Sequence, residues 1–254
     1  MFDNICKFLA ETFPIDFASW LLGEPIALTE LRPSQLSLEP IWADTPILLE
    51  SDNIVLHAEF QIQPKADIPF RMIDYRLRVY HRFPQKQMRQ TVVYLQPTTS
   101  ECVQQTCFNL EKTFHEFEII RLWEQPIEVF LQSPRLLPFA VLTQTDDRAR
   151  TLQEVAQAVV NIGDRRIQNN IAASTAILAG LVLEKELIQR ILRRGLMQES
   201  VIYQNILAEG KTEALEQGAL NLLNEGIAAE TVAKVTGLAI DHIRQLSVNH
   251  PVSE

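Results

Sequence analysis

EPIWADTPILLESDNIVLHAEFQIQP, residues 39–64, is the stretch that decides the predicted fold. Residues 41–49 and 54–62 are rich in β-branched and apolar side chains, as β-strands are. The four polar residues 50–53 lie between these two runs and are typical of a turn. The stretch therefore predicts a β-hairpin, around which the other elements of an α/β fold are arranged.

The length of the loop determines which residues of the two strands face each other. If all four polar residues form the loop, Leu49 pairs with Ile54 and Asp44 lies directly opposite Glu59. Side chains in such a pair have Cβ atoms about 5 Å apart, and two like charges placed there destabilise the sheet. We therefore expect a cation or open solvent beside these two carboxylates.

The second strand separates polar from apolar side chains. Successive residues of a strand point to opposite faces, so His57, Glu59 and Gln61 share one face and the apolar residues between them share the other. Two carboxylates and a main-chain carbonyl, here that of Phe60, are hard oxygen ligands of the kind that Mg²⁺ takes. The pattern predicts a metal site at Asp44, Glu59 and Phe60, suited to phosphodiester chemistry. The alternative is that both acids lie on the wet face of an ordinary hairpin.

The order of these residues resembles the D…(D/E)-x-K core of the PD-(D/E)XK nuclease superfamily. Longer stretches are similar to the Rpn-like group of recombination-promoting nucleases and transposases, especially its cyanobacterial-type members. They include MFDNICKFLAETFPIDFASWLLGEP (1–25), IPFRMIDYRLRVYHRFP (68–84) and ASTAILAGLVLEKELIQRILRRGLMQESVIYQ (173–204). The resemblance implies a restriction-endonuclease-like α/β core, in which helices flank a central mixed sheet. It also implies cleavage of DNA with Mg²⁺ or Mn²⁺, linked to recombination or transposition.

The resemblance assigns Asp44 and Glu59 to the metal, and it matches Glu11 to an acid that many of these nucleases add from their first helix. For Glu11 the alternative is an ordinary solvated helix side chain. Two positions depart from the motif, with Ala43 in place of its proline and Gln61 in place of its lysine. Gln61 can orient a water molecule but carries no charge, so more of the catalysis would fall to the metal. These departures keep open a catalytically weak or inactive protein that acts as a DNA-associated regulatory or interaction module.

A basic stretch follows the hairpin. Residues 65–89 contain seven Lys or Arg residues and two Asp, although the whole chain has a net charge of −9. The spacing predicts a helix over 69–83 with one apolar stripe, made of Phe70, Ile73, Leu77 and Tyr80. A second stripe carries Arg71, Arg78 and Arg82, which we expect to hold DNA phosphates beside the metal. The alternative is a solvated helix face whose arginines form salt bridges with the two Asp residues.

The remaining segments complete the predicted core. Residues 3–22 predict two helical pieces divided at Pro14, and residues 91–95 predict a buried strand. Residues 26–38 predict a first strand and a loop, so the resulting order of helix, three strands, helix and strand is the one expected for the nuclease core. Helix formers take over after residue 145, so we predict a nuclease-like domain at 1–145 and a helical region at 146–254.

The helical region contains a connector spaced by Gly210, Gly218 and Gly226, followed by residues 229–246, which resemble a small helix-turn-helix. The second helix of this pair offers few side chains suited to reading bases, so contact with DNA and a structural or partner-binding role both stay open. A homodimer through the C-terminal helices is a further alternative.

Composition narrows the class of protein. The acidic net charge argues against unspecific coating of nucleic acid, which requires many Lys and Arg residues. The longest apolar passage, residues 171–183, is too short to span a membrane, and no cleavable signal precedes it. Three cysteines cannot all pair, and their spacing does not suit zinc. We expect a cytoplasmic protein with reduced thiols and no zinc, whose partner is DNA.

Overall fold

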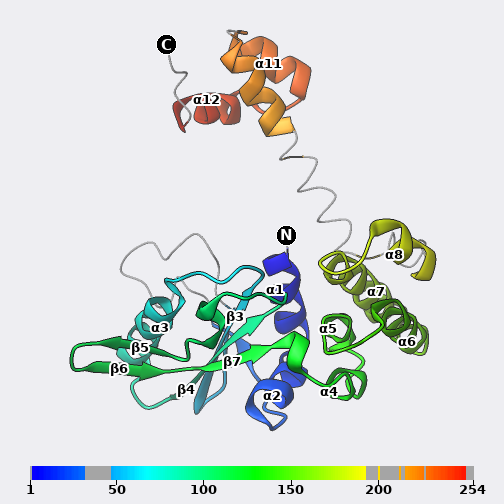
Figure 1. Cartoon of the computed structure of the whole chain (residues 1–254). Coiled ribbons are helices and arrows are strands. Elements are labelled where there is room, and N and C mark those ends of the chain that lie inside the picture. The colour runs from blue at the N-terminus through cyan, green and yellow to red at the C-terminus, as the bar shows by residue number, and fades with distance from the viewer. Residues whose placement is uncertain are drawn as a thin grey trace. The chain divides into compact units, whose positions relative to one another are not determined.

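The computed structural model contains two compact units, Met1–Ile202 and Tyr203–Glu254 (Figure 1). The residues that it describes are 2–31, 47–192, 200, 212, 215–225 and 227–249. The predicted boundary after residue 145 falls inside the first unit, because the helices that follow it pack against the helices before it. Helix α5 contacts both α6 and α7, for example.

Among the described residues of the first unit, five strands form a mixed sheet in the order β1-β2-β3-β4-β7. The strands are β1 (Thr29–Glu30), β2 (Ile47–Glu50), β3 (Ile54–Gln61), β4 (Gln87–Tyr94) and β7 (Glu118–Arg121). The β1–β2 and β2–β3 pairs are antiparallel, whereas β3–β4 and β4–β7 are parallel. The predicted α/β class and central mixed sheet are confirmed, and the strand predicted at residues 91–95 corresponds to β4.

Helices flank this sheet (Figure 1). The described α-helices of the first unit are α1 (Phe2–Thr12), α2 (Pro14–Leu22), α3 (Ile68–Arg82), α4 (Glu128–Leu131), α5 (Leu137–Ala140), α6 (Arg148–Val160), α7 (Arg165–Ala179) and α8 (Lys185–Ile191). Of these, α6, α7 and α8 pack on other helices beside the sheet. Pro14 begins α2 and Gly23, with φ +82°, ends it, so the predicted division at Pro14 is confirmed. Helix α3 is the crossover between the parallel strands β3 and β4.

The turn between β2 and β3 is tighter than the sequence predicts. Glu50 pairs with Val55, and the Ser51 N–H donates to the carbonyl of Ile54 at 2.9 Å. The predicted pairing of Leu49 with Ile54 is therefore wrong, because the first strand continues through Glu50, which was assigned to the loop.

The environment of Glu50 gives a physical reason for the tighter turn. Its carboxylate forms an ion pair with Lys86, which compensates the charge of a polar residue inside the strand. The register that was expected to place Asp44 opposite Glu59 is thus not the observed one. Asp44 itself lies outside the described residues.

The two faces of the sheet carry different chemistry. Phe60 points to one face and packs on Phe17 of α2 and Phe139 of α5, with ring centroids 6.2 and 5.6 Å away. The other face, which carries His57 and Glu59, lies under α3. Apolar packing on one face therefore holds β3 in place, and the polar side chains on its other face are available to form a functional site.

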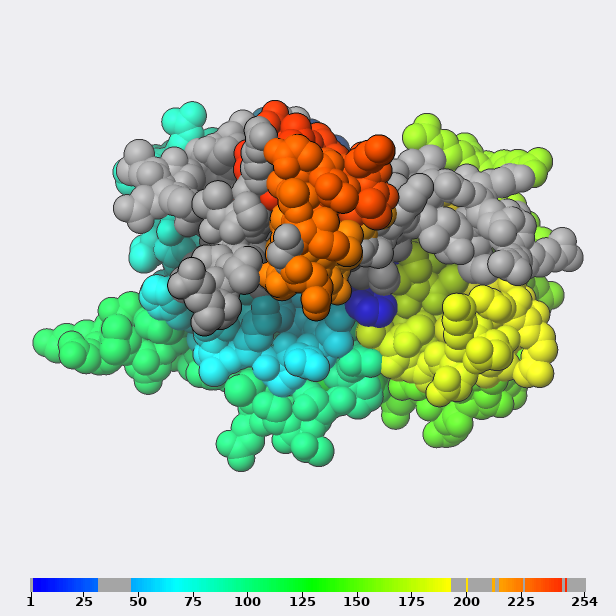
Figure 2. Space-filling view, turned by 90° about the horizontal axis from the view of Figure 1, so that it is seen from above, coloured from blue at the N-terminus to red at the C-terminus, as the bar shows by residue number. Residues whose placement is uncertain are grey.

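A two-stranded hairpin, β5 (Cys107–Leu110) with β6 (Thr113–Glu116), projects from the first unit in both views (Figures 1 and 2). It lies against α3, where Phe70 and Phe108 have ring centroids 6.0 Å apart. Two short 3-10 turns, Glu101–Gln104 and Leu122–Glu124, precede and follow this region. The hairpin thus places residues near position 115 beside the face of the sheet that α3 covers.

The second unit is helical. A helical segment at 215–224 is followed by α11 (Ala229–Thr236) and α12 (Ile240–Asn249), so the two predicted C-terminal helices are confirmed. Gly237, with φ +75°, ends α11. Ala219, Val232 and Ile243 form the small buried core of this unit. Across the described ranges, no helix combines the length and apolar character needed to cross a membrane.

Candidate functional site at Glu59

Glu59 is a buried carboxylate in the middle of the sheet. It lies on β3 and is 4% exposed, while Arg71 of α3 is 2% exposed. Nη2 of Arg71 donates to both oxygens of Glu59, at 2.9 Å to Oε1 and 3.0 Å to Oε2. A buried charge is costly unless an opposite charge accompanies it, so Arg71 makes this position possible for Glu59.

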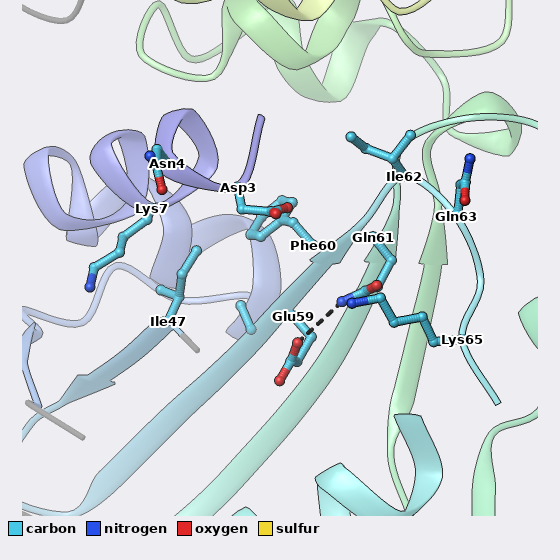
Figure 3. Close-up of a pocket in the computed structure, with 11 residues that line it drawn as sticks. Asp3, Asn4, Lys7, Ile47, Glu59, Phe60, Gln61, Ile62, Gln63 and Lys65 are labelled. Carbon is cyan, nitrogen blue, oxygen red and sulfur yellow. Dashed lines mark hydrogen bonds between the residues drawn. The ribbon is translucent and has the colours of Figure 1, made fainter. Parts of the chain in front are cut away.

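Two further side chains of β3 flank the carboxylate. Gln61 Nε2 donates to Glu59 Oε2 at 3.3 Å, and His57 Nε2 lies 3.4 Å from Oε1 (Figure 3 shows the Gln61 contact). The predicted shared face of His57, Glu59 and Gln61 is thereby confirmed. Burial, and next the charge of Glu59, raise the pKa of Tyr75 well above its ordinary value.

A buried amide continues the polar cluster on the neighbouring strand. Gln90 of β4 has Nε2 2.7 Å from the Met72 carbonyl and 2.9 Å from His57 Nδ1. Its Oε1 lies 2.7 Å from Nε2 of His115 on β6. Sequence reasoning did not single out Gln90 or His115 as a site residue. The available signal at Gln90 was a polar residue directly before the predicted buried strand at 91–95.

A pocket of about 370 Å³ opens at this end of β3 (Figure 3). It is lined by three residues of α1, by Ile47 of β2 and by β3 with the segment after it: Asp3, Asn4, Lys7, Ile47, Ala58, Glu59, Phe60, Gln61, Ile62, Gln63 and Lys65. Lys7 and Lys65 bring positive charge to a wall that also contains the Glu59 carboxylate. The wall thus carries both signs of charge, with the acids Asp3 and Glu59 beside the two lysines.

Glu11, the predicted first-helix acid, does not line the pocket. It forms an ion pair with Lys7 at 3.4 Å, one helical turn away. Burial raises the pKa of Glu11, and Glu30 adds to this effect while Lys7 opposes it. The acid that α1 contributes to the pocket wall is instead Asp3.

The three arginines predicted to hold phosphate lie in different environments. Arg71 points into the sheet and binds Glu59. Arg78 donates to Asp74 at 2.8 Å, which is the salt bridge of the alternative interpretation. Arg82 is exposed and lies over the ring of Phe83, 5.8 Å from its centroid. The structure does not bring these arginines together as one stripe facing the pocket.

The structure describes only some of the residues that were predicted to bind a metal beside Glu59. Asp44 lies outside the described residues, and Phe60 contributes to the pocket wall while its ring faces away from Glu59. In the part of the chain that the structure describes, no three His, Cys, Asp or Glu side chains are grouped closely enough to hold a metal ion.

Comparisons of the chain with protein-family models, with curated proteins and with solved structures find no match.

Proposed function

We propose that this chain is a metal-dependent DNA endonuclease with a restriction-endonuclease-like core, which hydrolyses phosphodiester bonds at the pocket beside Glu59. The observation that carries this proposal is a buried carboxylate at the edge of a pocket that two lysines also line. The order of the core elements supports it, since helices, three antiparallel strands, a helix and a parallel strand follow one another along the chain.

In this proposal Glu59 and Asp44 hold Mg²⁺ or Mn²⁺. Carboxylate oxygens are the ligands that these ions prefer, so the donor chemistry of Glu59 fits. The bound ion supplies an activated water molecule and stabilises charge on the phosphate. Gln61 keeps Glu59 oriented and can also position a water molecule, while Lys7 and Lys65 attract the phosphodiester.

A metal ion bound to Glu59 would share this carboxylate with Arg71. A carboxylate can accept about four hydrogen bonds, so Arg71 and a cation can share Glu59. Arg71 also supplies positive charge that Gln61, in place of the motif lysine, cannot supply. The same contacts favour a second candidate function, in which Arg71 keeps Glu59 from binding a metal well. The chain would then be a DNA-associated module with weak or no activity.

Cleavage of DNA by the purified full-length chain distinguishes these candidates. We expect supercoiled plasmid to be nicked with Mg²⁺ or Mn²⁺ and not with EDTA. Asp44→Ala and Glu59→Gln should lose this activity, whereas Glu116→Gln, an exposed acid on β6, should keep it. If the folded wild type binds DNA but cleaves it with neither metal, the second candidate replaces the first.

A further inference from the structure

The Met72 carbonyl fixes the orientation of the buried Gln90 amide. A carbonyl oxygen only accepts hydrogen bonds, so the Gln90 atom 2.7 Å from it must be the NH₂ group. This NH₂ group also lies 2.9 Å from His57 Nδ1, while the amide oxygen lies 2.7 Å from His115 Nε2. The assignment of amide nitrogen and oxygen therefore follows from the main chain of α3.

That orientation determines the tautomer of His57. One Gln90 N–H donates to Met72 and the other to His57 Nδ1, so Nδ1 accepts and carries no hydrogen. In the neutral ring the hydrogen is then on Nε2, which lies 3.4 Å from Glu59 Oε1. His57 is fully buried, and among the described residues its Nε2 has no hydrogen-bond partner of good geometry. The ring of Tyr75, 4.8 Å away, packs against it.

We propose that His57 is a positioning residue for Glu59, held by Gln90 in the tautomer that directs its Nε2–H towards Oε1. This inference deepens the proposed function and rests on it where it concerns a metal. Arg71 donates to both oxygens of Glu59, His57 lies beside Oε1 and Gln61 beside Oε2, so a cation at this carboxylate would share it with these three side chains. The same tautomer excludes Nε2 of His57 as a metal ligand, because that nitrogen has no lone pair to offer, while the lone pair of Nδ1 accepts from Gln90.

His115 forms the outer end of this directed chain. Gln90 Oε1 can only accept, so His115 Nε2 must be the donor. Hydrogen bonds thus run from His115 on β6 through Gln90 on β4 to His57 on β3, whose N–H points at Glu59. The projecting β5–β6 hairpin is coupled in this way to the orientation of the carboxylate.

The ring nitrogens of His57, observed by long-range ¹H–¹⁵N NMR in the full-length chain, test the tautomer without any metal. The chain has five histidines, so His57→Gln identifies the signal. We expect the Nε2–H form in the wild type. Gln90→Glu should convert it to a ring protonated at Nδ1, because a carboxylate accepts where the amide donated. A wild-type ring with its hydrogen on Nδ1 overturns the proposal, and this holds even if a variant fails to fold.

Mn²⁺ binding, followed by the electron paramagnetic resonance signal of the free ion, tests the positioning role. Gln90→Leu should weaken Mn²⁺ binding about 10-fold or more, as loss of an outer-shell hydrogen bond commonly does. Gln87→Leu is the matched control, because Gln87 is exposed on the same strand. Equal affinity in Gln90→Leu and wild type overturns the positioning role. If the wild type binds no Mn²⁺ and cuts no DNA, the proposed function and the metal part of this inference fail together, whereas the tautomer result stands separately.

Discussion

At the scale of single residues, the pairing of Glu59 with Arg71 dominates the energetics of the site. Both side chains are almost fully buried, so each compensates a charge that would otherwise be isolated from water. Removal of one partner from such a pair costs about 3–5 kcal/mol, whereas replacement of both costs much less. The pair therefore determines folding as well as chemistry at this position.

Urea unfolding of Arg71→Met, Glu59→Gln and the double variant tests this view of the pair. We expect Arg71→Met to lower the free energy of unfolding by about 3–5 kcal/mol, and the double variant to lose less than Arg71→Met alone. Arg78→Met is the control, because Arg78 and its partner Asp74 are both partly exposed to solvent and the loss should stay below about 1 kcal/mol. Similar losses in the two arginine variants would contradict a buried ion pair.

His115 makes the stability of the chain depend on pH. Burial, followed by the charges of Arg76 and His57, lowers the pKa of His115 below its ordinary value of 6.5. Between the two pKa values the unfolded chain binds more protons than the folded chain, so stability is lost as the pH falls through about 6.5. We expect His115→Gln to reduce this loss in unfolding curves recorded from pH 7.5 to 5.5. An unchanged dependence would show that His115 is not responsible.

The face of β3 that carries Glu59 and Gln61 could be predicted from the sequence, because a period of two separates polar from apolar side chains. Arg71 could not be predicted as the partner of Glu59. Its charge suggests a surface position, but a long apolar stem allows the guanidinium to reach a buried acid. Gln90 could not be predicted for a similar reason. The residues near it in the sequence do not reveal that His57 of the neighbouring strand lies beside it.

At the scale of elements, α3 turns a third stripe of side chains towards the sheet, and neither of the two predicted stripes forms its core face. Ile68, Met72, Tyr75 and Val79 are at most 1% exposed, and the buried Arg71 lies beside them. Phe70, Leu77 and Tyr80, which belong to the predicted apolar stripe, are 48%, 59% and 57% exposed. The apolar residues of α3 are spread over two faces, so the sequence pattern alone does not show which face is buried. The buried face is also the one that brings Arg71 to Glu59.

Two substitutions on α3 test its rotation. Val79→Ala removes two buried methyl groups and should lower the free energy of unfolding by about 1–3 kcal/mol. Leu77→Ala, on the exposed stripe, should change it by less than about 0.5 kcal/mol. The measurement is urea unfolding followed by circular dichroism. A larger effect of Leu77→Ala would mean that the opposite face packs on the sheet.

The register of the β2–β3 hairpin shows a second limit of sequence reasoning. Alternation along each strand could be predicted, because it depends on neighbouring residues only. The turn could not, since Glu50 looks like a loop residue until Lys86, far along the chain, compensates its charge. A change in loop length shifts every pair of the hairpin, so a small error at the turn alters the residue expected opposite Glu59.

At the scale of the whole molecule, contacts cluster within two units that meet in sequence at residues 202 and 203. Composition shifts near residue 145 suggested an earlier boundary, but α6 and α7 are held to α5 by tertiary packing that the composition does not reveal. The chemistry of the proposed site belongs to the first unit. A homodimer through the C-terminal helices stays a prediction.

A fragment of residues 1–202 tests this organisation. Because its core is formed within the unit, we expect the fragment to unfold cooperatively with a midpoint close to that of the full chain. Thermal unfolding by circular dichroism makes the comparison. A fragment that is unfolded at 25 °C would show that the second unit is needed for the fold of the first.

The rate of plasmid nicking as a function of Mn²⁺ concentration, for wild type and Glu59→Gln, tests the central claim most directly. The account predicts that the wild-type rate rises with Mn²⁺ and saturates, and that Glu59→Gln lowers the rate at saturation or the apparent affinity by more than about 100-fold while the protein stays folded. Nicking by Glu59→Gln that is equal to wild type across the titration would contradict it, because the carboxylate at the centre of the site would then have no part in the reaction.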